Sequence, residues 1–312
     1  MAKKGIILQH TGGEIGSQLW NFVSVYAYCL ERGISCENHS FYEFYEFFPQ
    51  FKPKNILVYI LFFIPFIRYR GRKDEPFVKF FRFIFRVYVR IIKTIFKSGI
   101  IVSDETNKDQ MFYLPPSGEL REINVMEKRD TFYFDKRIFR NPIGIEKHRE
   151  KIISAFTPQK DIRDEVANKL KRIRSEFDFV VGVHIRQGEY MTFKRGKFFV
   201  DQGHMRTFID EFISKFKIDK KKICFYITSD SPIEERFFYG LSYKIGGDNL
   251  AIEMFTLAGT DVIIGSDSHF GSFASYYGNI PHIVCHRTDI DWDYYKDKDT
   301  FFQNKYWKVS KA

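Results

Sequence analysis

Apolar and polar residues follow one another along the first 33 residues in the pattern of a strand, a loop and a helix. Residues 6–8 are apolar, and Gly12, Gly13 and Gly16 follow. Apolar residues then recur at helical spacing up to Gly33, where a helix end is expected. This order predicts a βα unit with a glycine loop at its crossover. The loop lacks the dinucleotide fingerprint GxGxxG, and a tight turn that only packs helix on strand would show the same pattern.

The second half of the chain alternates between strand and helix patterns. Mostly apolar runs predict a buried strand that begins at 179 and runs into a loop within 179–190, and further buried strands at 223–228, 261–264 and 280–286. Amphipathic stretches between them predict helices at 201–217 and 249–258, and a further helix follows a glycine- and serine-rich loop. This alternation indicates a doubly wound α/β fold with a parallel sheet. Its polar strand ends, at 184–190, 228–232 and 265–273, are expected to meet at one edge.

The strand that begins at Phe179 ends in a loop with the chemistry of an anion site. His184 and Arg186 lie on one face, because side chains two apart in an extended chain point the same way. The guanidinium of Arg186 matches a phosphate or carboxylate, and Gly188 lets the backbone approach a ligand closely. The alternative is a purely structural pair between Arg186 and Glu189 beside a core histidine. This stretch alone leaves both interpretations open.

The two neighbouring strand ends add hydroxyl groups and a carboxylate. Ser266, Ser268 and Ser272 surround a predicted helix start, where backbone N–H groups commonly bind an anion. Asp230 offers an acceptor for a ribose or a base. The chain has no Walker lysine, no HExxH and no carboxylate cluster suited to a metal. The pattern therefore predicts a nucleotide-sugar site that uses no metal and no other cofactor.

Composition places the chain among globular proteins of a reducing compartment. Hydrophobic residues make up 44% of it, its four cysteines form no CxxC pair, and the N-terminus shows no secretory signal. We therefore expect a cytoplasmic protein. The net charge of +10 arises in residues 51–97, which hold twelve Lys or Arg against two acids, while the remainder carries 37 of each sign. Charge confined to one segment argues against a nucleic-acid-binding protein.

Residues 51–97 combine an apolar run with a basic amphipathic stretch. The run at 56–67 is broken by Pro65 and is too short to span a bilayer. From 77 to 97 the basic residues recur at helical spacing, at positions 79, 82, 86, 90, 93 and 97, and the other positions are mostly apolar. This pattern predicts a helix in the plane of an anionic membrane surface. The alternative is a core helix with one solvated edge, which would show mixed charge and a narrower apolar face.

Four sequence blocks together resemble the bacterial α-1,2-fucosyltransferases. GGEIGSQLWNFVSVYAYCLERG resembles their GG-x-GNQLFQYA block, GVHIRQGEY their HxRRGDY motif, ITSDSP their second block, and SDSHFGSFASYYGN the block STFSWWA. The blocks fall in the family's order and span most of the chain. The resemblance implies the GT-B fold, with two facing Rossmann-like domains and parallel sheets. Residues 1–145 would form the acceptor-side domain, with the insertion 51–97, and residues 146–312 the nucleotide-sugar-binding domain.

The resemblance also implies roles for individual residues. Arg186 matches the first arginine of HxRRGDY, implied to hold the donor pyrophosphate, and Ser268 and Phe270 match the third block. The predicted donor-binding residues are His184, Arg186, Gln187, Gly188, Asp230, Ser266, Ser268, His269 and Phe270. The predicted glycine loop contains Gly12, Gly13, Gly16, Ser17 and Gln18. Candidates for the group that takes the acceptor proton are His10, Glu14 and Glu189, with Arg186 stabilising the leaving diphosphate.

Three positions depart from the family pattern. The second arginine is Gln187, the aspartate is Glu189, and the asparagine of GNQ is Ser17. A neutral amide at 187 cannot stabilise a diphosphate as a guanidinium does. The chain therefore uses another sugar nucleotide, or it is slow, or a cation such as Lys194 or Arg195 has taken over the role.

The resemblance implies GDP-fucose as the donor and inversion without a metal, so the expected function is inverting transfer of fucose from GDP-fucose to a hydroxyl of a cell-surface glycan precursor. The expected partners are the donor, a glycan acceptor that includes lipid-linked forms, and an anionic membrane surface bound through residues 77–97, with no nucleic acid. The enzyme would be peripheral on the inner face of the cytoplasmic membrane. The alternatives are a transferase with another nucleotide sugar and a non-catalytic membrane-surface protein that binds nucleotide or anionic lipid.

Overall fold

A computed structural model describes most of the chain and divides it into two compact units, Met1–Gln159 and Lys160–Ala312. The described residues are 3–9, 14–53, 58, 76–95, 100–102, 112–114, 129–135, 138–219, 221–247, 249–287 and 289–295. The division falls after Gln159 rather than after residue 145, because the short helices α5 (Pro142–Lys147) and α6 (Arg149–Ala155) pack on α1 (Ile15–Glu31) of the first unit.

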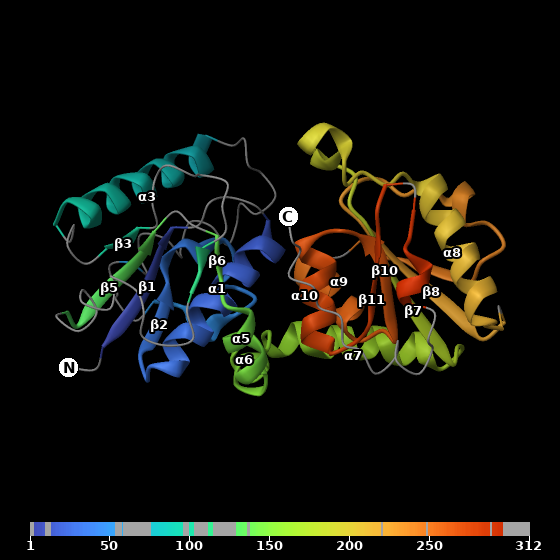
Figure 1. Cartoon of the computed structure of the whole chain (residues 1–312), viewed down its shortest axis with the longest axis horizontal. Helices are drawn as coiled ribbons and strands as arrows, with labels where there is room; N and C mark the ends of the chain where they lie inside the picture. The colour runs from blue at the N-terminus through green and yellow to red at the C-terminus, as the bar shows by residue number, and fades with distance from the viewer. Residues whose placement is uncertain are drawn as a thin grey trace. The chain divides into compact units, whose positions relative to one another are not determined.

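The first unit is built on a four-stranded parallel sheet in the order β2-β1-β5-β3 (Figure 1). Its strands are β1 (Lys4–Gln9), β2 (Ser35–Asn38), β3 (Ile100–Val102) and β5 (Thr131–Asp135). A second pair, β4 (Phe112–Tyr113) and β6 (Phe139–Arg140), is also parallel. The predicted strand and helix at 5–33 are thus confirmed as β1 and α1. Two 3-10 turns, η1 (His39–Phe44) and η2 (Pro49–Phe51), follow β2.

Aromatic side chains fill the core around α1. The ring of Phe22 lies 5.3 Å from Phe41, 4.7 Å from Phe51 and 4.9 Å from Phe156, centroid to centroid. Such tilted and edge-to-face contacts add to the free energy gained by burying the rings. The aromatic segment after β2 is therefore part of the first unit's core, and it helps fix α1 on the sheet.

The basic stretch predicted to be helical is the helix α3 (Pro76–Ile95). It lies along the sheet of the first unit near β3 and β5 (Figure 1). Its side chains Phe85 and Val89 are buried and pack with Ile6, Leu8 and Tyr133 of that sheet. The helix is therefore an integral part of the unit's core on one of its faces.

The second unit is a five-stranded parallel sheet in the order β11-β10-β7-β8-β9. Its strands are β7 (Phe179–Ile185), β8 (Ile223–Ser229), β9 (Tyr243–Ile245), β10 (Val262–Ser266) and β11 (His282–Cys285). Its helices are α7 (Lys160–Arg174), α8 (Gln202–Phe216), α9 (Leu250–Ala258) and α10 (His269–Gly278). The described residues of this unit also form the 3-10 turns η4 (Glu189–Met191), η5 (Phe193–Gly196), η6 (Glu235–Phe238) and η7 (Trp292–Tyr295).

The register of the second sheet brings three polar strand ends together. His184 of β7 is paired with Gly265 of β10 on one side and with Thr228 of β8 on the other. Ligands of open parallel sheets bind at the carboxyl ends of the strands. The predicted meeting of the loops after β7, β8 and β10 is confirmed, and this edge is where the candidate site lies.

Candidate functional site

His184 is a buried side chain near the carboxyl end of β7, at this edge of the sheet. His184 is 4% exposed, its Nδ1 lies 3.2 Å from Oγ1 of Thr228, and its ring stacks on Phe270 with centroids 4.8 Å apart. Burial, with smaller contributions from Arg186 and His282, lowers the pKa of His184 to about 3. The imidazole is therefore neutral near pH 7. Its Nε2 has no hydrogen-bond partner among the described residues.

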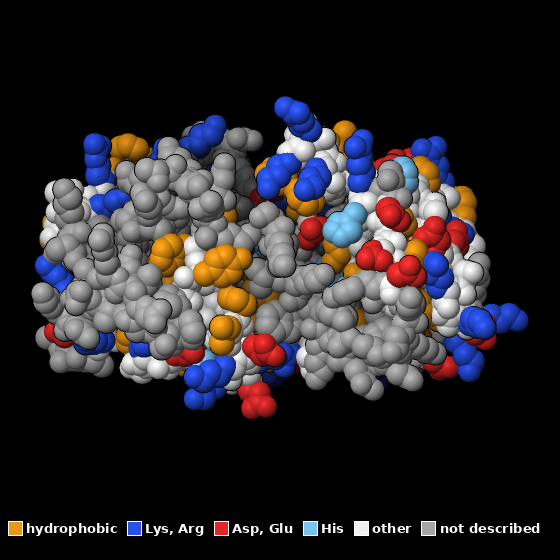
Figure 2. Space-filling view, viewed as in Figure 1, with side chains coloured by type: hydrophobic (Ala, Val, Ile, Leu, Met, Phe, Trp, Pro, Cys, Tyr) orange, Lys and Arg blue, Asp and Glu red, His pale blue; other side chains and the backbone are white. Residues whose placement is uncertain are grey.

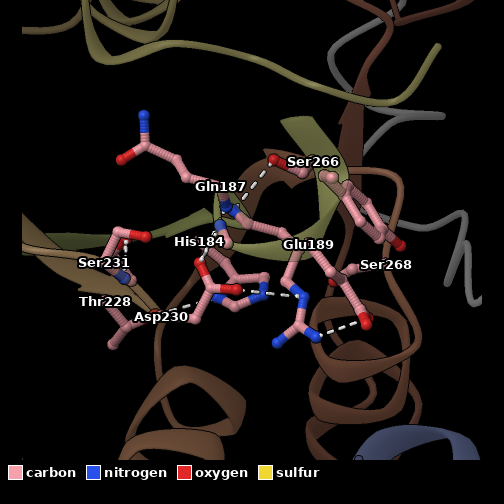
Figure 3. Close-up of polar contacts among 12 residues, drawn as sticks. His184, Gln187, Glu189, Thr228, Asp230, Ser231, Ser266 and Ser268 are labelled. Atoms are coloured by element: carbon pink, nitrogen blue, oxygen red, sulfur yellow. Dashed lines mark hydrogen bonds and ion pairs between the residues drawn. The ribbon is translucent and has the colours of Figure 1, made fainter. Parts of the chain in front are cut away.

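Arg186 lies between two carboxylates. Its Nη2 donates to Oε1 of Glu189 at 2.8 Å, and its Nε lies 3.2 Å from Oδ2 of Asp230 (Figure 3). Burial disfavours the charge, but the hydrogen bond to Glu189 and the charge of Asp230 outweigh it, so the pKa of Arg186 is raised. The pair between Arg186 and Glu189 that the sequence offered as the structural alternative is thus present, and anion binding by Arg186 stays a prediction.

Asp230 fixes the loop that carries Arg186. Its Oδ1 accepts hydrogen bonds from the backbone N–H of Gln187 at 2.7 Å and of Gly188 at 3.2 Å. A Cβ atom at position 188 would lie 2.6 Å from Oδ2 of Asp230, which is closer than real contacts allow. The absence of a Cβ at Gly188 therefore gives the carboxylate room to lie against the loop. Both oxygens of Asp230 have partners from the chain itself, so this residue positions the loop.

The side chain of Gln187 points away from the carboxylates of Glu189 and Asp230 (Figure 3). Its Oε1 accepts a hydrogen bond of 2.9 Å from Nε2 of Gln202, which is 5% exposed. Gln202 also donates to the carbonyl of Pro232 and accepts from the N–H of Glu234. In this conformation the amide of Gln187 ties the loop after β7 to the loop after β8, and it does not act as a second anion-binding group beside Arg186.

Two of the predicted serines hold the backbone at the ends of β7 and β10. Oγ of the buried Ser266 accepts from the N–H of Arg186 at 3.1 Å. Ser268 is the N-cap of α10, and its Oγ accepts from the N–H of Gly271 at 3.2 Å. An N-cap of this kind satisfies one of the unpaired donors of the first turn. His269 and Phe270 begin the helix, so all the donor-side residues predicted from the sequence lie at or just beyond the carboxyl ends of β7, β8 and β10.

Residues 189–199 follow Arg186 and form what we call the basic lobe. Most of this lobe lies beyond the GVHIRQGEY motif, so the motif did not identify it. The rings of Tyr190, Phe193 and Phe198 lie within 6.2 Å of one another, and the Tyr190 hydroxyl donates to the carbonyl of Asp267. Lys194 and Arg195 are exposed and have left-handed backbones, with φ of 46° and 59°. Figure 2 shows Lys and Arg side chains gathered over this lobe. The sequence feature that could have identified this lobe is the alternation of aromatic and basic residues in YMTFKRGKF, residues 190–198.

The predicted glycine loop belongs to the first unit. His10, Gly12 and Gly13 lie outside the described residues. Glu14 is the N-cap residue of α1, although its side chain does not cap the helix, and Gly16 and Gln18 are buried in the first turns, with Ser17 half-buried. The candidate proton acceptors His10, Glu14 and Glu189 therefore stay predictions. Among the described residues no group of three or more His, Cys, Asp or Glu side chains could hold a metal ion.

Neither a protein-family model nor a curated protein sequence matches this chain. Solved structures do match its fold. POFUT1 in complex with GDP matches with a TM-score of 0.52 and 12% identity over 89% of this chain and 95% of that one. Fucosyltransferase NodZ from Bradyrhizobium matches with a TM-score of 0.51 and 15% identity, over 91% and 96%. NodZ α-1,6-fucosyltransferase soaked with GDP-fucose matches with a TM-score of 0.50 and 15% identity, over 90% and 94%.

The chain has the fold of known fucosyltransferases. The predicted α/β class with parallel sheets, as in GT-B enzymes, is confirmed. At 12–15% identity the likeness is one of fold. The narrower assignment to the α-1,2 family stays a prediction.

Proposed function

We propose that this protein is a glycosyltransferase that uses GDP-fucose as its donor and binds the diphosphate with Arg186. The observation that carries the proposal is the position of this guanidinium. It stands at the carboxyl end of β7, on a loop braced by Asp230, in a fold shared with proteins solved with GDP and GDP-fucose. A planar guanidinium on a fixed loop is well suited to a diphosphate.

Donor binding exchanges one partner of Arg186. Glu189 is 64% exposed and makes only a side-chain contact to Arg186, whereas Asp230 also holds two backbone N–H groups. The diphosphate therefore displaces Glu189 and leaves Asp230 in place. The site is then preorganised on one side of the guanidinium and exchangeable on the other.

The reaction is a displacement at the anomeric carbon of the sugar. The acceptor hydroxyl attacks this carbon and loses its proton to a carboxylate or imidazole, for which Glu189, Glu14 and His10 are the candidates. The bond from the anomeric carbon to the diphosphate breaks, and its electron pair leaves with GDP, whose charge Arg186 stabilises. We further propose that the transfer inverts the anomeric configuration, forms an α-1,2 linkage and uses a cell-surface glycan precursor as the acceptor.

The cation missing at position 187 is supplied by the basic lobe. Lys194 and Arg195 follow Arg186 closely in sequence, and the lobe is tied to the loop before α10 through Tyr190. A left-handed backbone at a non-glycine residue costs free energy and is found preferentially at functional sites. We assign to these two side chains the neutralisation of charge that a second arginine would provide.

A nucleotide screen on the intact protein tests the proposal. The melting temperature is measured with GDP, UDP, CMP and dTDP, because a ligand of the native state raises apparent stability. We expect the largest shift with GDP, and release of GDP from GDP-fucose in the presence of acceptor glycans. A shift with another nucleotide alone would favour another sugar donor. Binding without transfer or hydrolysis for any donor would favour the non-catalytic alternative.

A further inference from the structure

Helix α3 divides its apolar side chains between two opposite faces. The inner face holds Phe85 and Val89, which are 8% and 5% exposed and pack on the sheet of the first unit. The outer face holds Phe80, Phe83, Val87, Ile91 and Ile95, which are between 41% and 65% exposed. We call these five residues the outer strip. Their spacing of three or four residues places them in one line along the helix.

The outer strip is unusual in this protein. It supplies five of the twelve large apolar side chains that the described part of the chain exposes. The remaining seven are dispersed over other elements. Single exposed apolar residues are normal on protein surfaces, but a continuous line of them marks an interaction site.

Basic residues border the outer strip along one side. Lys79, Arg86 and Arg90 are exposed, and helical spacing places them next to Phe83. In Figure 2, basic and hydrophobic side chains lie beside each other at the upper left of the view, over α3. Residues 76–95 contain no Asp or Glu, so no acid on the helix neutralises these charges.

Two other cations of the predicted stripe turn toward the protein. Arg82 lies 3.0 Å from a carboxylate oxygen of Glu43, and Lys93 lies 2.6 Å from Oδ2 of the fully buried Asp135. The sequence-based expectation that every cation of the stripe serves an external surface is thus corrected for these two, while Lys97 lies outside the described residues. Three outward cations remain to match an external partner.

We propose that the outer face of α3 docks this protein on the surface of an anionic lipid bilayer. The strip would enter the boundary between headgroups and acyl chains, and Lys79, Arg86 and Arg90 would bind the anionic headgroups. The cations form a single edge beside a straight apolar line, which is the arrangement of an in-plane helix. No helix among the described residues is long and apolar enough to cross a membrane. This docking is independent of the proposed sugar transfer.

The experiment measures binding of the full-length protein to vesicles by flotation. The vesicles are made of phosphatidylcholine with or without phosphatidylglycerol. The test variant combines Lys79→Glu, Arg86→Glu and Arg90→Glu. The matched control combines Arg163→Glu, Lys171→Glu and Arg172→Glu on the exposed face of α7, which changes the net charge equally. A second variant, Phe83→Ser with Ile91→Ser, tests the outer strip.

We expect the wild type and the α7 control to bind vesicles that contain phosphatidylglycerol, and salt to weaken the binding. Each removed cation is expected to reduce affinity about fivefold, so the α3 charge variant should lose at least about 100-fold. The Phe83 and Ile91 variant should also lose binding while keeping a wild-type circular dichroism spectrum. The measurement uses no sugar donor, so its outcome is separate from that of the nucleotide screen.

Three results would overturn the proposal. The wild type could fail to bind anionic vesicles at low salt, or the α7 control could lose as much affinity as the α3 variant. The protein could also form dimers in sedimentation experiments that Phe83→Ser with Ile91→Ser dissociates, with vesicle binding unchanged. The last result would assign the outer strip to contact between two copies of the chain.

Discussion

The loop after β7 and the helix α3 both carry arginine and lysine residues, but the two regions use them in different ways. In the loop, Arg186 is paired with both Glu189 and Asp230. We propose that a donor diphosphate replaces Glu189, so the partner of this guanidinium changes when the donor binds. On α3, Lys93 is paired with a buried carboxylate of the fold, while Lys79 and Arg90 face outward. On the roles proposed above, a cation paired with a buried carboxylate, such as Lys93 with Asp135, serves the fold, whereas a cation paired with an exposed carboxylate, such as Arg186 with Glu189, can exchange it for a ligand.

The largest effect is expected for Lys93→Ala. This change leaves the carboxylate of Asp135 buried without its cation, although Gln9 still donates to it, and losing one partner of a buried pair costs about 3–5 kcal/mol of unfolding free energy. Urea denaturation provides the measurement. Lys79→Ala should change stability by less than about 0.5 kcal/mol. The double variant Lys93→Ala with Asp135→Asn should recover part of the lost unfolding free energy. If Lys93→Ala and Lys79→Ala lower the unfolding free energy equally, Lys93 does not stabilise the fold more than an outward-facing lysine does.

Arg186→Ala should reduce the free energy of GDP binding by about 2–4 kcal/mol, since charge-assisted hydrogen bonds to the diphosphate are lost. The fold should persist, because Asp230 keeps its two backbone donors. Isothermal titration calorimetry measures the affinity, with Arg163→Ala on the surface of α7 as the control. A variant that unfolds, together with a wild type that does not bind GDP, would assign Arg186 to the fold alone.

Arg195→Gly separates backbone strain from charge in the basic lobe. Glycine adopts a φ of 59° without penalty, so stability should stay the same or rise by up to about 1 kcal/mol, while GDP affinity falls. Lys217→Gly is the control, because Lys217 has a φ of 51° at the C-terminal end of α8. It should raise stability similarly and leave GDP affinity unchanged. If both variants bind GDP like the wild type, Arg195 has no part in the site.

The smallest effect is expected for Glu189→Gln. Removing the charge that competes for Arg186 should strengthen GDP binding by less than about 1 kcal/mol, since Glu189 is 64% exposed and exposed pairs contribute little. Titration with GDP measures this gain. Turnover with GDP-fucose gives a second result: a large loss of kcat with tighter GDP binding would identify Glu189 as the proton acceptor. Weaker GDP binding would mean that Glu189 supports the loop rather than competes for Arg186.

The parallel sheet of the second unit could be predicted from the sequence because its strands are apolar runs that end in polar loops. The position of Arg186 followed from the same pattern. The role of Gln187 could not be predicted, since its partner Gln202 begins the next helix and the pairing depends on the turn between them. The pairing of Lys93 with Asp135 could not be predicted from the sequence of the helix either, because the carboxylate comes from a strand more than forty residues away.

The attachment of α3 to the sheet has a consequence for protein production. A basic, partly apolar segment is a common target for deletion when a protein is hard to keep in solution. Deleting α3 would expose Ile6, Leu8 and Tyr133 to solvent and would remove the cation that pairs with Asp135. The truncated first unit should therefore misfold and aggregate. Substituting polar residues at the outer strip, at Phe83 and Ile91 for example, would improve solubility and leave the inner face intact.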